Sequence, residues 1–141
     1  MILPDVNVLI YAFRSEAEQH EAYRAWLEDV VNGPSAYGIA PQVLAGVVRI
    51  CTHPRIFKQP STLDDVLEFC DVLSEQPNAS LVSPGERHWS IFESLCRQSR
   101  VSGNLVQDAW FAALAIESGC EWITADRDYA KFDGLSWRTP V

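Results

Sequence analysis

The sequence predicts an α/β protein, a three-layer α/β/α sandwich around a central, mostly parallel sheet. Short β-type runs alternate with longer segments of helical periodicity, and strands that alternate with helices pair in parallel. The chain of 141 residues is 48% hydrophobic, which is enough to bury one sizeable core without disulfides or a structural metal. We therefore expect residues 1–141 to form a single domain.

The first half of the chain contains two expected strands, each followed by helix. A strand at 2–5 precedes a short helix at 6–13 and an amphipathic helix at 19–31, whose expected buried face carries Ala22, Trp26 and Val30. A second strand at 36–40 leads into a mostly apolar helix that begins at Pro41 and ends at Cys51.

The second half repeats this alternation. Ser61 or Thr62 is expected to cap a helix that runs to about Ser74, and a third strand at 79–82 follows. A helix at about 86–100 precedes an apolar helix that Asp108 opens and Ser118-Gly119 ends. The last expected strands lie at 120–124 and 135–137.

Composition and charge exclude several classes of protein. The net charge of −8 argues against a protein that coats duplex nucleic acid, since phosphate contacts need clustered cations. No apolar run approaches the ~20 residues that span a bilayer, so we expect no membrane association. No signal peptide is recognisable at the N-terminus, which favours the cytoplasm. The four cysteines lack metal-ligand spacing and are expected to be buried and reduced.

Three aspartates stand at the ends of predicted elements. Asp5 closes the first strand, Asp108 opens the apolar helix, and Asp126 follows the strand at 120–124. Folds of this class keep their chemistry at such positions, and carboxylates gathered on one face are the ligands that Mg²⁺ and Mn²⁺ prefer. Helix N-termini lower the pKa of nearby carboxylates, so we expect these three to be ionised. The pattern indicates a metal site that acts on phosphate esters.

The local sequence around these acids resembles the PIN-domain ribonucleases, and closely the VapC-type toxins of bacterial toxin–antitoxin pairs. The resemblance covers essentially the whole chain. It rests on short sequence motifs that occur in a fixed order, at 5–9, 52–57, 104–109, 124–132 and 134–138. It implies a PIN-like fold and an endoribonuclease, dependent on Mg²⁺ or Mn²⁺, that cleaves structured RNA such as tRNA or ribosomal RNA. It also implies a homodimer and inhibition by a cognate VapB-type antitoxin. The family's acids fall on Asp5, Asp108 and Asp126, with Asp128 as a frequent accessory metal ligand.

The sequence departs from the family pattern at one position. The family usually has a glutamate on the helix after the second strand, and Gly46 occupies that place. Gln42 is the nearest polar oxygen and is a candidate neutral ligand. The departure puts a two-metal mechanism in doubt and leaves an alternative open, a catalytically weakened PIN-like RNA-binding module. A phosphatase or receiver domain is disfavoured, because neither pattern of acids is satisfied.

Several neighbours of the three acids have two interpretations. Asn7 either orients Asp5 or caps the first helix, Thr124 either faces the metal or is an ordinary strand residue, and Asn104 either contacts substrate or forms a turn. Cations that could contact RNA, or be ordinary solvated side chains, include Arg49, Arg55, Lys58, Arg127 and Lys131.

Overall fold

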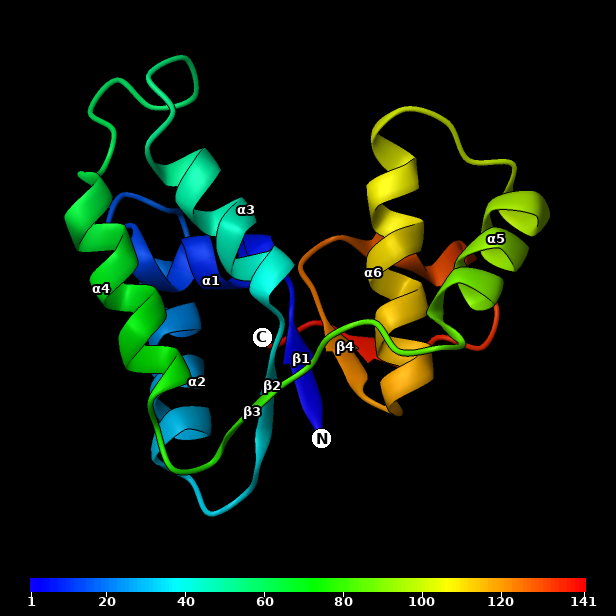
Figure 1. The fold of residues 1–141 in the computed structure, drawn as a ribbon. Helices are drawn as coiled ribbons and strands as arrows, with labels where there is room; N and C mark the ends of the chain where they lie inside the picture. The colour runs from blue at the N-terminus through cyan, green and yellow to red at the C-terminus, as the bar shows by residue number, and fades with distance from the viewer.

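A computed structural model describes all residues 1–141 and contains one five-stranded sheet between two groups of helices (Figure 1). The strands are β1 (Ile2–Pro4), β2 (Tyr37–Ile39), β3 (Ala79–Leu81), β4 (Glu121–Ile123) and β5 (Trp137–Arg138). The helices are α1 (Val6–Phe13), α2 (His20–Asn32), α3 (Pro41–Cys51), α4 (Leu63–Ser74), α5 (His88–Ser99), α6 (Asn104–Ser118) and the short 3₁₀ helix η1 (Arg127–Lys131).

The sheet has the strand order β3-β2-β1-β4-β5, and every pair is parallel. The predicted α/β/α sandwich with a mostly parallel sheet is therefore confirmed. Helices α1 to α4 lie on one side of the sheet and α5 and α6 on the other (Figure 1). The helices between β1 and β3 cover one face of the sheet, and the helices between β3 and β4 cover the other face. The two connections diverge between β1 and β4, which makes this place a topological switch point.

The hydrophobic core includes buried side chains of the central strands. It consists of 30 buried hydrophobic residues, and Trp122, Tyr37 and Leu3 are the largest of those that are fully buried. Pro4 is the last residue of β1, as expected for a residue that cannot donate to a strand ladder. The main chain continues the β1–β4 ladder one step further, because Asp5 N donates to the Ile123 carbonyl at 2.8 Å.

Three sequence-based boundaries or faces were wrong. Helix α6 begins at Asn104, so Asp108 lies in its second turn and does not open it. The cause is that residues 104–107 are exposed, and the apolar pattern starts only where the helix meets the core. On α2 the fully buried residues are Tyr23 and Leu27; of the predicted face, Trp26 and Val30 are partly buried against the core and only Ala22 is exposed. The last strand lies at Trp137–Arg138, later than 135–137.

None of the helices combines the length and apolarity that crossing a membrane requires.

Candidate active site

A cleft of about 570 Å³ lies at the carboxyl ends of β1 and β4, between α1 and α3 on one wall and α6 on the other. It brings together residues that are more than 100 positions apart in sequence. Its polar lining consists of Asp5, Asn7, Gln42, Arg49, Asn104, Gln107, Asp108, Asp126 and Tyr129. All three predicted aspartates are in this set, so the fold gathers them at the switch point of the sheet.

Asp5 is the most enclosed of the three acids, with 5% of its surface exposed. It caps α1: Oδ1 accepts from Val6 N at 2.6 Å, and Oδ2 accepts from the Thr124 hydroxyl at 2.7 Å. Burial raises the pKa of Asp5 to about 7, the two hydrogen bonds offset part of this rise, and the charges of Asp108 and Asp126 add to it. The expectation that a helix N-terminus lowers this pKa was wrong, because desolvation outweighs the capping interaction.

Thr124 connects the acids to one another. Its fully buried hydroxyl donates to Asp5 and accepts from Asp126 N at 3.0 Å. Asn7 extends the connection, since its amide NH₂ lies 3.4 Å from the Thr124 hydroxyl and its Oδ1 accepts from Ala125 N at 3.2 Å. Asn7 therefore does not cap α1, and it reaches Asp5 only through Thr124. This network fixes the end of β4 against the start of α1.

Asp108 and Tyr129 form a second pair. Asp108 projects from α6 and is partly buried, and its Oδ1 accepts from the buried Tyr129 hydroxyl at 3.2 Å. Burial raises the pKa of Asp108, while the Tyr129 hydrogen bond works against this rise. Sequence reasoning overlooked Tyr129. The available signal was an aromatic residue three positions after Asp126, at the spacing that returns a side chain of a 3₁₀ turn to the same face.

Asp126 caps η1 by accepting from Asp128 N at 2.9 Å. Its side chain lines the cleft, whereas Asp128 is exposed and does not belong to the lining. Asn104, the first residue of α6, lines the cleft together with Gln107, which the sequence analysis did not single out. Among the predicted cations Arg49 lines the cleft, while Arg55 and Arg127 are exposed elsewhere.

No cationic side chain pairs directly with the acids of the cleft, although Arg49 lines it and the charge of Lys131 lowers the pKa of Asp108. No Lys, Arg or His side chain lies within 4.0 Å of the carboxylates of Asp5, Asp108 or Asp126. Yet no set of three or more His, Cys, Asp or Glu side chains is spaced to hold a metal ion. The three acids nevertheless line one cleft, and the charges of Asp108 and Asp126 act on Asp5, so they lie close enough to repel one another. In chemistry and charge the acids fit a hard divalent cation, one for which water completes the coordination shell.

Close packing of two helices surrounds Gly46, the position at which a glutamate was expected. Gly46 lines the cleft, but a Cβ at this position would lie 3.0 Å from Val6 Cγ2, so α1 and α3 approach each other closely here. Gln42 also lines the cleft, and its Oε1 accepts a hydrogen bond from the Trp110 indole N–H. That bond links α3 to α6 and occupies an oxygen that we had considered as a neutral ligand.

Comparison with known proteins identifies the family to which this site belongs. Residues 2–135 match the PIN domain family. The chain is a member of the PIN domain family. Among relatives of this PIN domain, ribonuclease VapC43 of Mycobacterium tuberculosis is 40% identical over 141 residues, which are 100% of this chain and 96% of that protein. Ribonuclease VapC25 of the same species is 35% identical over 132 residues, covering 94% and 93% of the two chains.

Solved structures show the same fold at lower identity. One match is VapBC2 from Rickettsia felis, solved with a fragment of its promoter DNA. It has a TM-score of 0.71 and 16% identity, over 99% of this PIN domain and 98% of that chain. A toxin–antitoxin complex from Klebsiella pneumoniae gives a TM-score of 0.68 at 18% identity, over 100% and 98%. The sarcin–ricin loop cleaving toxin VapC20 of Mycobacterium tuberculosis gives 0.64 at 15%, over 96% and 99%. The predicted VapC-type PIN family is thus confirmed.

Proposed function

We propose that residues 1–141 act as one PIN-like ribonuclease domain, a divalent-metal-dependent endoribonuclease that is the toxin of a toxin–antitoxin pair. Its substrate would be structured RNA, such as tRNA or ribosomal RNA, and its ion Mg²⁺ or Mn²⁺. The VapC ribonucleases to which the chain is similar support the reaction class.

The observation that carries the metal-dependent reaction is the uncompensated charge of the cleft. Asp5 has a pKa raised to about 7 by burial and by two acids, and no cationic side chain pairs with any of them. A divalent cation would restore the ionised state of Asp5 and remove the repulsion. A buried group of like charges with no protein partner is costly unless it binds something positive.

In this proposal Asp5, Asp108 and Asp126 hold the ion, and the exposed Asp128 could approach as an accessory ligand. The bound ion would activate water as the nucleophile and offset the charge that develops on the phosphodiester. Thr124 and Asn7 hold Asp5 and the Asp126 main chain in place, and Tyr129 holds Asp108. Arg49 on α3 and Asn104 on α6 line the same cleft and would contact the RNA strand.

The test is Asp108→Asn, which keeps the shape of the side chain and removes one charge. We expect Mg²⁺-dependent RNA cleavage to fall by at least about a hundredfold, the scale on which loss of one electrostatic group acts. We expect the melting temperature in EDTA to rise, because repulsion within the cleft is relieved. Asp133→Asn, at an exposed position, is the matched control.

The rival function is a catalytically weakened RNA-binding module, and the spacing of the acids and Gly46 favour it. Binding of RNA without Mg²⁺-dependent cleavage by the wild-type chain would establish that rival. Cleavage that persists at the wild-type rate in Asp108→Asn would instead remove Asp108 from the active site.

A VapB-type antitoxin is the proposed partner. An apolar groove of about 390 Å³ between α1, α2 and α4 offers it a surface, with Phe13, Leu27 and Phe69 in its lining. Phe13 and Phe69 are the aromatic residues of this lining, whereas Tyr11 and Trp26 lie outside it. A basic residue of the antitoxin could enter the acidic cleft and form charge-assisted bonds there. Homodimerisation also remains a prediction, and light scattering of the purified chain tests it.

A further inference from the structure

The eleven residues between α3 and α4, 52–62, form an ordered loop rather than a loose connection; we call it the α3–α4 loop. Ile56 N and Phe57 N both donate to the His53 carbonyl at 3.1 Å. Arg55 N donates to the His53 ring Nδ1 at 3.1 Å, and Ser61 N closes the base of the loop by donating to the Cys51 carbonyl at 2.8 Å. Such compact surface loops often carry function.

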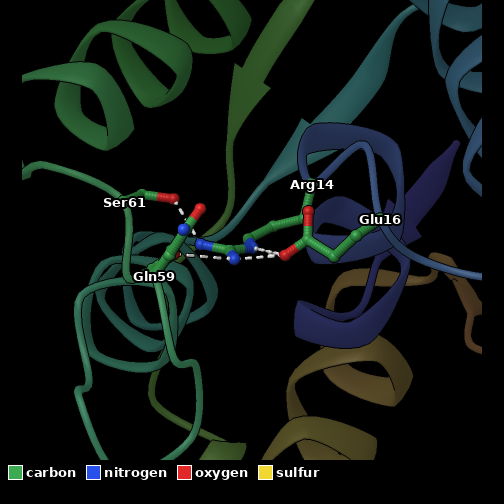
Figure 2. Close-up of polar contacts among 4 residues, drawn as sticks. All are labelled: Arg14, Glu16, Gln59 and Ser61. Atoms are coloured by element: carbon green, nitrogen blue, oxygen red, sulfur yellow. Dashed lines mark hydrogen bonds and ion pairs between the residues drawn. The ribbon is translucent and has the colours of Figure 1, made fainter.

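Arg14, which ends α1, holds this loop from outside it. Its guanidinium donates to the Ser61 hydroxyl at 2.9 Å and to the Gln59 carbonyl at 3.0 Å, and it pairs with Glu16 (Figure 2). The same group lies 3.8 Å from the centre of the Phe57 ring. Only 10% of the Arg14 side chain is exposed. A planar fork that contacts two points of one loop is a role that Arg fills and Lys does not.

The charge of this region is opposite to that of the chain as a whole. Residues 30–63 contain no Asp or Glu, although the chain carries a net charge of −8. The segment carries Arg49, Arg55 and Lys58, and none of these has a carboxylate within 4.0 Å. The three cationic side chains therefore form no ion pair within the protein, although Arg49 shares the cleft with the acids and Lys58 shares its hollow with Glu16.

Arg49 lies near the end of α3, and Arg55 and Lys58 lie in the loop that follows this helix. Arg49 lines the cleft, and Lys58 lines a separate hollow of about 690 Å³ together with Arg14 and Ile56. The loop projects beyond α3 at the same end of the molecule at which α6 begins (Figure 1). A strand whose phosphodiester lies among the acids, and that leaves the cleft along α3, would meet Arg49 first and the α3–α4 loop next.

We propose that the α3–α4 loop is a docking surface for the RNA backbone flanking the cut site, and that Arg14 is the positioning residue that keeps this surface in its binding shape. The inference rests on the proposed ribonuclease function. Arg55 and Lys58 contact phosphates, while Arg14 does not touch RNA. The loop supplies affinity for the strand, and the acids of the cleft carry out the reaction.

The first test measures RNA binding in the cleavage-deficient Asp108→Asn chain, with a fluorescein-labelled RNA hairpin as the probe and KCl as the variable. Arg55→Gln combined with Lys58→Gln should weaken binding about tenfold at low salt. It should also reduce the slope of log Kd against log salt by about 1.4, since each lost phosphate contact contributes about 0.7 for single strands. Arg87→Gln combined with Arg97→Gln removes the same charge at exposed positions near α5 and should change neither quantity.

An unchanged affinity and slope in the loop variant would overturn the docking surface. That failure is distinct from failure of the ribonuclease itself, which would appear as absence of Mg²⁺-dependent cleavage by the wild-type chain. In the active background, the loop variant should raise KM for the hairpin and leave kcat at saturating RNA near its wild-type value. A fall in kcat alone would also contradict the proposal.

The second test concerns Arg14. Arg14→Gln and Arg14→Lys should both weaken hairpin binding several-fold and should both speed amide hydrogen exchange within 52–62, with little change elsewhere. Wild-type binding by either variant, or faster exchange throughout the chain, would overturn the positioning role. If both variants fail to fold, Ser61→Ala removes one acceptor of the guanidinium and should produce the same two effects in smaller measure.

Discussion

At the scale of single residues, burial and hydrogen bonding decide how each acid of the cleft behaves. Asp5 lies in a nearly closed environment and accepts two hydrogen bonds, whereas Asp108 is partly open and accepts one from Tyr129. Burial raises the pKa of both Asp5 and Asp108, and the hydrogen bonds from Thr124 and Tyr129 work against this rise. Two predictions follow from these surroundings.

The first concerns the pH dependence of stability without metal. Burial raises the pKa of Asp5 from its ordinary value of 3.8 to about 7 in the folded chain, so the folded state binds more protons than the unfolded state between these limits. The free energy of unfolding should therefore fall as pH rises from about 4 to about 7, by on the order of 4 kcal/mol from this group. Urea unfolding in EDTA at several pH values measures this slope.

Asp5→Asn should flatten that pH dependence, and Asp133→Asn at an exposed position should not. Mg²⁺ at millimolar concentration should reverse the destabilisation at pH 7 by ligand linkage. Parallel pH profiles for the wild type and Asp5→Asn would show that Asp5 is not held in the protonated form.

The second prediction concerns the Tyr129 hydroxyl. Tyr129→Phe removes the donor to Asp108 and keeps the buried ring, so stability should fall by only about 0.5–1.5 kcal/mol. Cleavage should fall by about tenfold through kcat, because Asp108 loses the bond that orients it. Tyr23→Phe, a buried tyrosine on α2, is the control. Equal cleavage rates for Tyr129→Phe and the control would exclude a positioning role.

At the scale of elements, the width of the cleft is set by how closely helices approach one another. Helices α1 and α3 meet at Gly46 and Val6, and Gln42 joins α3 to α6 through Trp110. A side chain at position 46 would have to displace Val6 by a few tenths of an ångström. The glycine therefore keeps the helices close and leaves the cleft one carboxylate short of the family pattern.

Gly46→Glu should supply that carboxylate and tighten Mn²⁺ binding, as measured by calorimetry. Combining it with Val6→Ala relieves the close contact and should retain the gain. The gain in helix propensity over glycine, up to about 1 kcal/mol, should offset part of the packing cost. Gly46→Gln is the control, because its side chain has nearly the same shape as glutamate without the charge. If Gly46→Glu folds and binds Mn²⁺ no more tightly than Gly46→Gln, a carboxylate at position 46 does not bind the metal.

At the scale of the whole molecule, the acidic cleft and the apolar groove are different surfaces, since no residue lines both. The hollow beside the α3–α4 loop shares Phe13 and Ser15 with the apolar groove between α1, α2 and α4. This arrangement suits an RNA strand on one surface and an antitoxin segment on the other. Steering of a basic antitoxin by a −8 chain should also make its association rate fall with salt.

A substitution in the groove should separate inhibition from activity. Val72→Asp places a charge in the groove lining, at a side chain that is 50% exposed, so folding should be little affected. Antitoxin binding in a pull-down should weaken by at least tenfold while Mg²⁺-dependent cleavage persists. Leu81→Asp, on β3 at 69% exposure, is the control. Undiminished antitoxin binding by Val72→Asp would place the antitoxin on another surface.

The sequence by itself determined the class of fold, the order of elements and the identity of the three acids. These features depend on local periodicity, on Pro and Gly at element ends, and on short sequence motifs, all of which lie within short stretches of the chain. Gly46 was also identified as a departure from the family pattern, since one position in a helix is enough to reveal it.

Only the tertiary structure decided the environment of those acids. The raised pKa of Asp5 depends on burial by segments that are far away in sequence, and Thr124 lies 119 positions from the carboxylate to which it donates. The Tyr129–Asp108 bond, the Gln42–Trp110 bond and the Arg14 contacts likewise join elements that periodicity treats separately. Desolvation and long-range hydrogen bonding arise only when the chain is packed, so no local pattern predicts them.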